Sequence, residues 1–205
     1  MHQYLSVAPV ASLIFVITVI TTLLTFSNES WYGKLMLHPY SVYRGRNVYT
    51  LLTSGLIHKD WMHMFFNMFS YFFFAFQLEL TIGHWQFGVL YILSMILSDL
   101  PSVIKHKDDF WYNSLGASGA ISAVIFSSIL YHPLDKMMIL PIPFAIPAII
   151  FGVLYLVYCN YASKYSRDNI NHDAHLFGAL SGIGITVLLN VHVISTFIEQ
   201  IRMAI

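Results

Sequence analysis

Residues 62–80 read MHMFFNMFSYFFFAFQLEL, and this stretch decides what kind of fold the chain adopts. Apolar and aromatic side chains dominate it, and Glu79 near its end is the one acidic residue within it. A helix that crosses a lipid bilayer needs about 20 predominantly apolar residues. The stretch therefore predicts a transmembrane helix.

Five further apolar runs accompany this one. We expect six transmembrane helices, at residues 8–26, 62–80, 85–104, 117–131, 142–161 and 174–198. The predicted fold class is an all-α integral membrane protein, a six-helix bundle that forms a single domain over residues 1–205. The fourth run is short for a membrane span, so we expect it to lie centrally in the bundle or to begin below the membrane surface. No cleavage site follows the first run, which we expect to be retained.

The composition supports a membrane protein and excludes some other classes. Of the 205 residues, 57% are hydrophobic and 10% are charged, whereas about 25% of a soluble domain is charged. Ten basic residues balance ten acidic ones, so no nucleic-acid partner is predicted. Cys159 is the only cysteine, which excludes an intrachain disulfide, and we expect it to fill the core.

Polar residues inside the spans are the candidates for chemistry, because lipid offers no partner to a buried polar group. Spans two, four and six run in the same direction, and each begins with such a residue. His63, Ser118 and His175 are therefore expected at similar depth on one face of the membrane. At opposite ends of their spans they would be about 30 Å apart. The wider set is His63, Asn67, Glu79, Asp99, Ser118, Asp173 and His175.

The candidate nucleophile lies in Gly116-Ala117-Ser118-Gly119. At a helix start, free backbone N–H groups and the positive end of the helix dipole favour an oxyanion. The flanking glycines leave the hydroxyl accessible. The alternative interpretation is a packing motif, because small residues let membrane helices approach closely.

His175 is the candidate base. Gly178 and Gly182 follow it with the spacing that permits close helix contact. A histidine that takes a serine proton must lie within hydrogen-bond reach of the hydroxyl. A structural histidine is the alternative that the residue alone leaves open.

His63 and Asn67 are four residues apart and so share one face of the second span. Both side chains can donate hydrogen bonds, as an oxyanion hole requires. Hydrogen bonding between helices is the alternative.

Three motifs together resemble the rhomboid family of intramembrane serine proteases in its compact six-helix form. They are His63-x-x-x-Asn67, Gly116-x-Ser118-Gly119 and Ala174-His175-x-x-Gly178-x-x-x-Gly182, in that order along nearly the whole chain. The resemblance implies a Ser–His dyad without a third acid, which cleaves transmembrane segments of membrane proteins in the bilayer and needs no cofactor or metal.

The resemblance also implies residue roles. Ser118 would attack, and His175 would act as base and then as acid. His63, Asn67 and the Ser118 backbone N–H would hold the oxyanion. Glu79, followed by Gly83, would tie a loop down by hydrogen bonding. The structural supports are Gly116, Gly119, Gly178 and Gly182.

The chain departs from the family pattern at three places. Tyr49-Thr50 replaces a common Trp-Arg pair, and Ala75-Phe76 replaces a glycine pair. Ser122 stands where many relatives carry a tyrosine whose ring packs on the histidine. Another group must therefore orient His175.

The orientation in the membrane has two conflicting indicators. All Lys and Arg residues except Lys136 and Arg202 lie in the first, third and fifth loops, which the positive-inside rule would place in the cytoplasm. The resemblance implies that these loops lie outside, and we follow it. We expect the plasma or inner membrane of a bacterium.

Three alternatives stay open. The first is a catalytically inactive rhomboid-like protein that binds membrane clients. The second is a transporter or proton channel with a relay of Asp99, Asp173, His172 and His175. The third is a metal site at His172-Asp173-Ala174-His175 or between His58 and His63, for which the spacings are loose.

Overall fold

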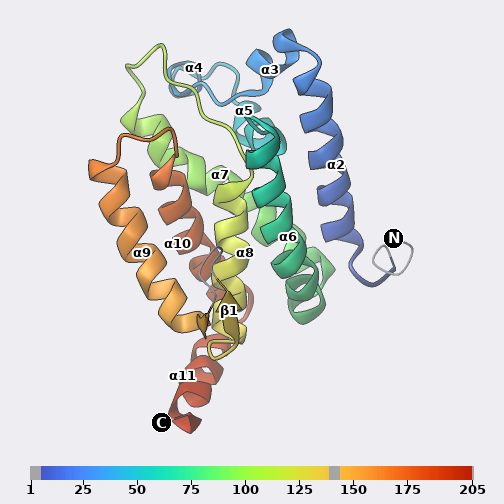
Figure 1. Ribbon diagram of the computed structural model, residues 1–205, viewed down its shortest axis with the longest axis vertical. Coiled ribbons are helices and arrows are strands. Elements are labelled where there is room, and N and C mark those ends of the chain that lie inside the picture. The colour runs from blue at the N-terminus through green and yellow to red at the C-terminus, as the bar shows by residue number, and fades with distance from the viewer. Residues whose placement is uncertain (1–5, 139–143, 205) are drawn as a thin grey trace.

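The computed structural model describes residues 6–138 and 144–204. Within them, the chain forms an all-α membrane bundle (Figure 1). Among the described residues, four helices are long and apolar enough to cross a membrane, namely α2, α6, α7 and α10, and α8 is a shorter apolar helix. The six bundle helices are α2 Pro9–Phe26, α6 Trp61–Ile82, α7 His84–Lys105, α8 Ser118–Tyr131, α9 Ala148–Tyr165 and α10 His172–Leu189.

Short helices and strands lie at both ends of the bundle (Figure 1). The first loop carries α3 Glu29–Leu35, α4 Pro39–Tyr43, α5 Thr50–Thr53 and the 3-10 helix η1 Ser54–Leu56. At the other end are the antiparallel strands β1 Lys136–Met138 and β2 Ala145–Pro147, with Met137 opposite Ile146, and the terminal helix α11 Val193–Met203.

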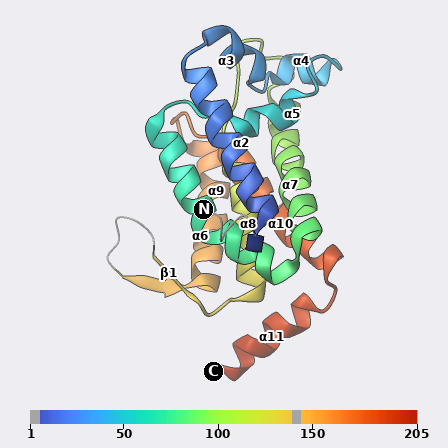
Figure 2. The ribbon, with the colours of Figure 1, turned by 90° about the vertical axis from the view of Figure 1, so that its right-hand side faces the viewer.

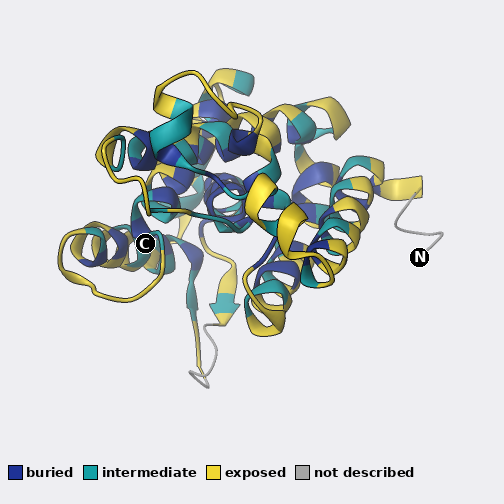
Figure 3. Ribbon diagram, turned by 90° about the horizontal axis from the view of Figure 1, so that it is seen from above, coloured by how far each residue is buried: buried dark blue, intermediate teal, exposed yellow. Residues whose placement is uncertain are grey.

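Helix α8 is the centre of the bundle, packed against α6, α7, α9 and α10. Ten of its fourteen residues are buried, and Figure 2 shows the ribbon of α8 among the other helices of the bundle. The outer helices differ from α8, because many of their apolar side chains are exposed on the outside of the bundle. Phe65, Phe69 and Phe73 along α6 are all exposed, as expected where lipid is the solvent. Figure 3 gives the same contrast from above, with buried segments inside and exposed ones around them.

Glycines let α10 approach α8 closely. A methyl group on Gly178 would collide with the backbone of Gly119, and one on Gly182 would collide with the backbone of Ala123. Close backbone contact of this kind is how membrane helices pack without a hydrophobic driving force. It brings the start of α10 against the start of α8, where Ser118 lies.

Two of the predicted spans have bounds that differ from those of the helices in the structure. The span predicted at 142–161 begins as a helix only at Ala148, because Pro147 and the residue before it favour an extended backbone; residues 142–143 lie outside the described residues. The span predicted at 174–198 is two helices. Asn190 is extended, its side chain accepts from the His192 N–H, and the chain turns there before α11.

Candidate active site

The structure brings Ser118 and His175 together. The His175 Nε2 and the Ser118 Oγ lie 2.7 Å apart, although the two residues are 57 positions apart in sequence. Both residues are half-buried, so the pair is enclosed by the bundle but not sealed. A neutral imidazole whose Nε2 accepts from the hydroxyl is the arrangement that a general base requires.

The chain turns sharply just before the serine. Gly116 has φ of 120°, a conformation that side chains disfavour, and its N–H donates to the Ser54 carbonyl at 2.9 Å. A side chain at this position would strike the His63 ring. The turn lets α8 begin at Ser118, so the first N–H groups of that helix lack partners within it.

His58 braces this turn from inside the protein. Its ring is wholly buried. Nδ1 lies 3.0 Å from the Thr22 Oγ1, and Nε2 accepts from the Ala117 N–H at 3.5 Å. Because the Thr22 hydroxyl already donates to a carbonyl, the ring must be neutral with its proton on Nδ1. Burial, and then the nearby His63, lowers the pKa of His58 to about 3.

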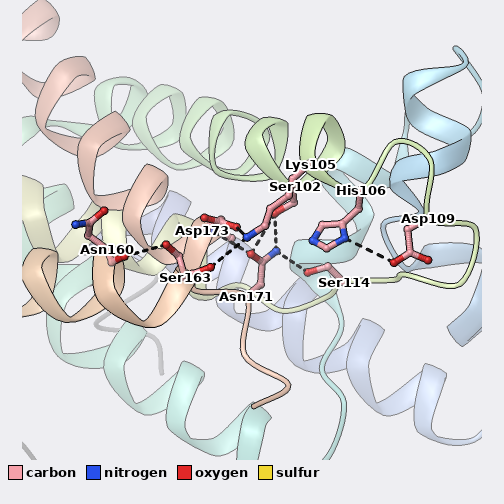
Figure 4. A network of polar contacts seen from close by, with 10 residues as sticks. Ser102, Lys105, His106, Asp109, Ser114, Asn160, Ser163, Asn171 and Asp173 are labelled. Carbon is pink, nitrogen blue, oxygen red and sulfur yellow. Dashed lines mark hydrogen bonds and ion pairs between the residues drawn. The ribbon is translucent and has the colours of Figure 1, made fainter. Parts of the chain in front are cut away.

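A polar network fixes the start of α10 (Figure 4). The Asn171 Oδ1 caps the helix by accepting from the Ala174 N–H at 3.0 Å. The Asn171 Nδ2 donates to the hydroxyls of Ser102 at 2.9 Å and Ser114 at 3.0 Å. One side chain thereby joins the end of α7, the loop before Ser118 and the helix that carries His175.

An ion pair strengthens the same junction. The Lys105 Nζ lies 2.6 Å from the Asp173 carboxylate and also donates to the Ser163 carbonyl on α9 at 3.2 Å (Figure 4). The carboxylate of Asp99, by contrast, accepts from the Ser54 hydroxyl at 3.2 Å. The acidic groups considered for a proton relay are thus bound to partners at the dyad end of the bundle.

The two candidate oxyanion donors have different surroundings. His63 lies against Gly116, next to the serine turn. The Asn67 Nδ2 donates to the His63 carbonyl at 2.8 Å, within its own helix, and the residue is buried. Among the described residues, no hydrogen bond joins Asn67 to Ser118 or His175.

Glu79 lies at the other end of the bundle. Its carboxylate accepts from the backbone N–H groups of Val10 at 3.1 Å and Ala11 at 2.6 Å, and it contacts the His84 Nδ1 at 2.6 Å. A carboxylate at the start of α2 is stabilised by the helix dipole. Glu79 thus caps α2, and its contact with His84 also spans the turn at Gly83.

Tyr155 on α9 is a site residue that sequence reasoning missed. Its ring stacks beside the His175 ring, with centroids 6.5 Å apart and planes inclined by 20°. Its hydroxyl and the Ser122 hydroxyl are hydrogen-bonded at 2.7 Å. Tyr155 thus gives His175 an aromatic neighbour, which the resemblance led us to expect from a tyrosine at position 122. The only signal in the sequence was the unusual Ser122, because an apolar run gives no sign of which residue faces the site.

These features define a class of protein, a multi-pass helical membrane protein with a serine and a histidine in contact at the starts of two inner helices. The family model of the Rhomboid domain matches residues 45–191, and the chain belongs to the rhomboid family. The candidate rhomboid protease YdcA of Bacillus subtilis (strain 168) is 30% identical over 146 residues, 67% of this chain and 65% of that protein. RHOMBOID-like protein 12, mitochondrial, of Arabidopsis thaliana is 25% identical over 169 residues.

The Arabidopsis match covers 75% of this chain and 50% of that protein. The chain therefore spans less than two thirds of the length of either relative. The matched family region extends from the first loop to just beyond α10, so it includes both Ser118 and His175.

Proposed function

We propose that this chain is an intramembrane serine endopeptidase that cleaves transmembrane segments of membrane proteins with Ser118 and His175. The observation that carries the proposal is the 2.7 Å contact between the His175 Nε2 and the Ser118 Oγ in a half-buried site. Membership of the rhomboid family supports the same reaction.

The reaction follows from the atoms in contact. The His175 Nε2 takes the hydroxyl proton while the Ser118 Oγ attacks the carbonyl carbon of the scissile peptide. The tetrahedral intermediate then collapses, and His175 passes its proton to the leaving amine. Water, activated by the same histidine, hydrolyses the acyl-enzyme and frees the serine.

The negative charge of the intermediate needs donors that are already in place. The backbone N–H of Ser118 at the first position of α8 is one candidate, and His63 beside Gly116 is a second. Asn67 uses one donor on the His63 carbonyl. Its amide has a second N–H for the oxyanion.

Tyr155 is proposed as the residue that orients His175. A dyad has no acid to hold the imidazole, and the stacked ring of Tyr155 limits its rotation. The Ser122 hydroxyl anchors the tyrosine in turn. Tyr155 therefore acts through His175 as a positioning residue and does not itself touch the reacting atoms.

The proposed setting is the plasma membrane of a bacterium, with transmembrane proteins as substrates. A relative from Bacillus subtilis supports a bacterial origin. Cleavage at the start of α8 and α10 would occur near one membrane surface, since both residues lie at helix ends.

The test is cleavage of transmembrane substrates in proteoliposomes by the wild type, Ser118→Ala and His175→Ala. Removing either member of a catalytic pair lowers the rate by about a thousandfold or more. Ser128→Ala is the matched control, because among the described residues the Ser128 hydroxyl bonds only to the Val124 carbonyl of its own helix.

Loss of cleavage in both dyad variants, with the control active, supports the proposal. Equal cleavage by all four proteins contradicts it and indicates a contaminant. If the wild type binds transmembrane clients but cleaves none of them, the chain is an inactive client-binding relative instead.

A further inference from the structure

A second cluster of reactive side chains lies behind the dyad. Cys159 on α9 and His172 and His175 on α10 each offer one ligand atom, and these atoms lie within 4.8 Å of one another. Cys159 is 1% exposed and His172 is 4% exposed. The cluster is thus a group of one thiol and two imidazoles, with Cys159 and His172 buried and His175 half-buried, and it shares His175 with the proposed active site.

One nitrogen in the cluster lacks a partner. The His172 Nε2 lies 3.1 Å from both carboxylate oxygens of Asp168. Its Nδ1 is buried and has no hydrogen-bond partner among the described residues. Such an atom is unusual, because buried polar groups are nearly always paired. It indicates a position that a ligand is suited to fill.

The hydrogen bonds made by the two histidines leave matching atoms for a ligand. Asp168 occupies the Nε2 of His172, and Ser118 occupies the Nε2 of His175. The nitrogen that remains on each ring is Nδ1. A carboxylate on the far nitrogen of a histidine is also the arrangement that orients imidazoles toward metals and raises their basicity.

We propose that Cys159, His172 and His175 form a binding site for a zinc-class divalent cation that switches off the serine–histidine pair. Thiolate and imidazole are the ligands that Zn²⁺ prefers, and three protein ligands leave the fourth tetrahedral position for water. Sequence reasoning considered His172 and His175 as metal ligands and found their spacing loose; it did not connect them with Cys159, which lies on a different helix.

The inhibitory effect rests on the proposed protease function and follows from proton positions. Cation binding replaces the thiol proton of Cys159, which leaves to water, and forms a bond between sulfur and metal. Binding at the His175 Nδ1 displaces the proton from that nitrogen, and the neutral ring then carries its proton on Nε2. Such a ring donates to the Ser118 hydroxyl and can no longer take its proton.

Cation binding is tested without any protease activity. Ser118→Ala protein in detergent is titrated with Co²⁺, which replaces zinc and gives a thiolate-to-metal charge-transfer absorption. Because Cys159 is the only cysteine, such a band can come from no other residue of the chain. We expect the band to appear with one equivalent of Co²⁺. Adding Cys159→Ser should abolish the band. Adding His172→Asn should weaken the affinity for Co²⁺ at least tenfold.

The alternative outcomes overturn the site. One such outcome is the absence of a charge-transfer band in the Ser118→Ala protein. The other is equal Co²⁺ affinity in the Ser118→Ala protein and the Ser118→Ala, His172→Asn double variant. His192→Asn is the matched control, because it changes an exposed histidine in the turn after α10.

Inhibition is tested separately by cleavage with and without Zn²⁺, expressed as a ratio for each protein. We expect Zn²⁺ to lower wild-type cleavage at least tenfold, a chelator to restore it, and Cys159→Ser and His172→Asn to lose this sensitivity. Equal inhibition of the wild type and both variants would refute the switch. Co²⁺ binding in a protein that never cleaves would uphold the cation site and count against the proposed protease and the switch.

Discussion

Two polar groups lie at opposite ends of this bundle, and they differ in how deeply they are buried and how fully they are paired. Glu79 is wholly buried and accepts from two backbone N–H groups as well as contacting His84. At the other end, Ser118 and His175 are half-buried, and the contact between them is the bond that defines the pair. The carboxylate is buried with three partners, and the serine–histidine pair is partly exposed.

The difference separates structure from chemistry. A wholly buried carboxylate that is bonded on both oxygens is out of reach of a substrate, and its removal leaves unpaired groups in a medium that cannot solvate them. A hydroxyl bonded to one imidazole at an open helix start retains capacity for a reacting carbonyl. Both groups lie at helix N-termini, so the helix dipole alone does not distinguish them.

The largest effect on stability is expected from Glu79→Ala. The variant leaves the N–H groups of Val10 and Ala11 unpaired, which should cost about 3 kcal/mol of unfolding free energy. Denaturant titration in detergent measures this loss, and Glu199→Ala, on exposed α11, is the control. Lost cleavage in a fully stable Glu79→Ala protein would show that the residue is catalytic after all.

A second prediction concerns pH and His58. The pKa of this buried ring is lowered to about 3, against about 6.5 in an unfolded chain. Between these values the unfolded state binds the extra proton, so stability is full above pH 6.5 and falls as the pH decreases. The expected loss from His58 is about 2 kcal/mol at pH 5. Unfolding at pH 7 and pH 5 measures it, and His58→Gln should flatten the dependence; an unchanged slope would refute it.

The contact between α8 and α10 should be sensitive to one methyl group. Gly178→Ala would force the starts of the two helices apart, at a cost of about 1–3 kcal/mol, and should reduce cleavage as well as stability. Gly184→Ala is the matched control on the same helix, where a methyl group meets nothing within 4 Å. Equal stability of the two variants would mean that the close contact is dispensable.

The smallest effect is expected from Tyr155. Tyr155→Leu removes the ring beside His175 and should lower kcat about tenfold with little change in KM, since the ring positions a transition-state group. Tyr155→Phe keeps the ring and loses the contacts of its hydroxyl with Ser122 and Cys159, so most activity should return. If the two variants are equally impaired, the hydroxyl matters and the stacked ring does not.

The sequence allowed residues to be placed near one another where their motifs begin spans that run in the same direction across the membrane. The parity of the spans predicted Ser118 and His175 at one depth, and the spacing of Gly178 and Gly182 predicted the close helix contact. The all-α membrane bundle was also predictable, because lipid leaves helices as the simplest way to pair every backbone group.

Other features depend on which face of α9 meets α10, which no local pattern records. Tyr155 and Cys159 look like any residues of an apolar run. In the structure, Tyr155 lies beside His175, and Cys159 lies close to His172 and His175. The break at Asn190 was hidden because apolar residues continue on both sides of it. Hydropathy indicates whether a segment is surrounded by lipid or by water, but not where the chain turns within it or which neighbour each side chain faces.

The central claim is that His175 activates Ser118 as a nucleophile. The most direct measurement is reaction of the purified protein with a fluorophosphonate, followed by mass spectrometry of the labelled peptides. We expect one adduct on Ser118 in the wild type, and none above background in His175→Ala at equal folding. Equal labelling of both proteins, or an adduct on a different serine, would contradict it.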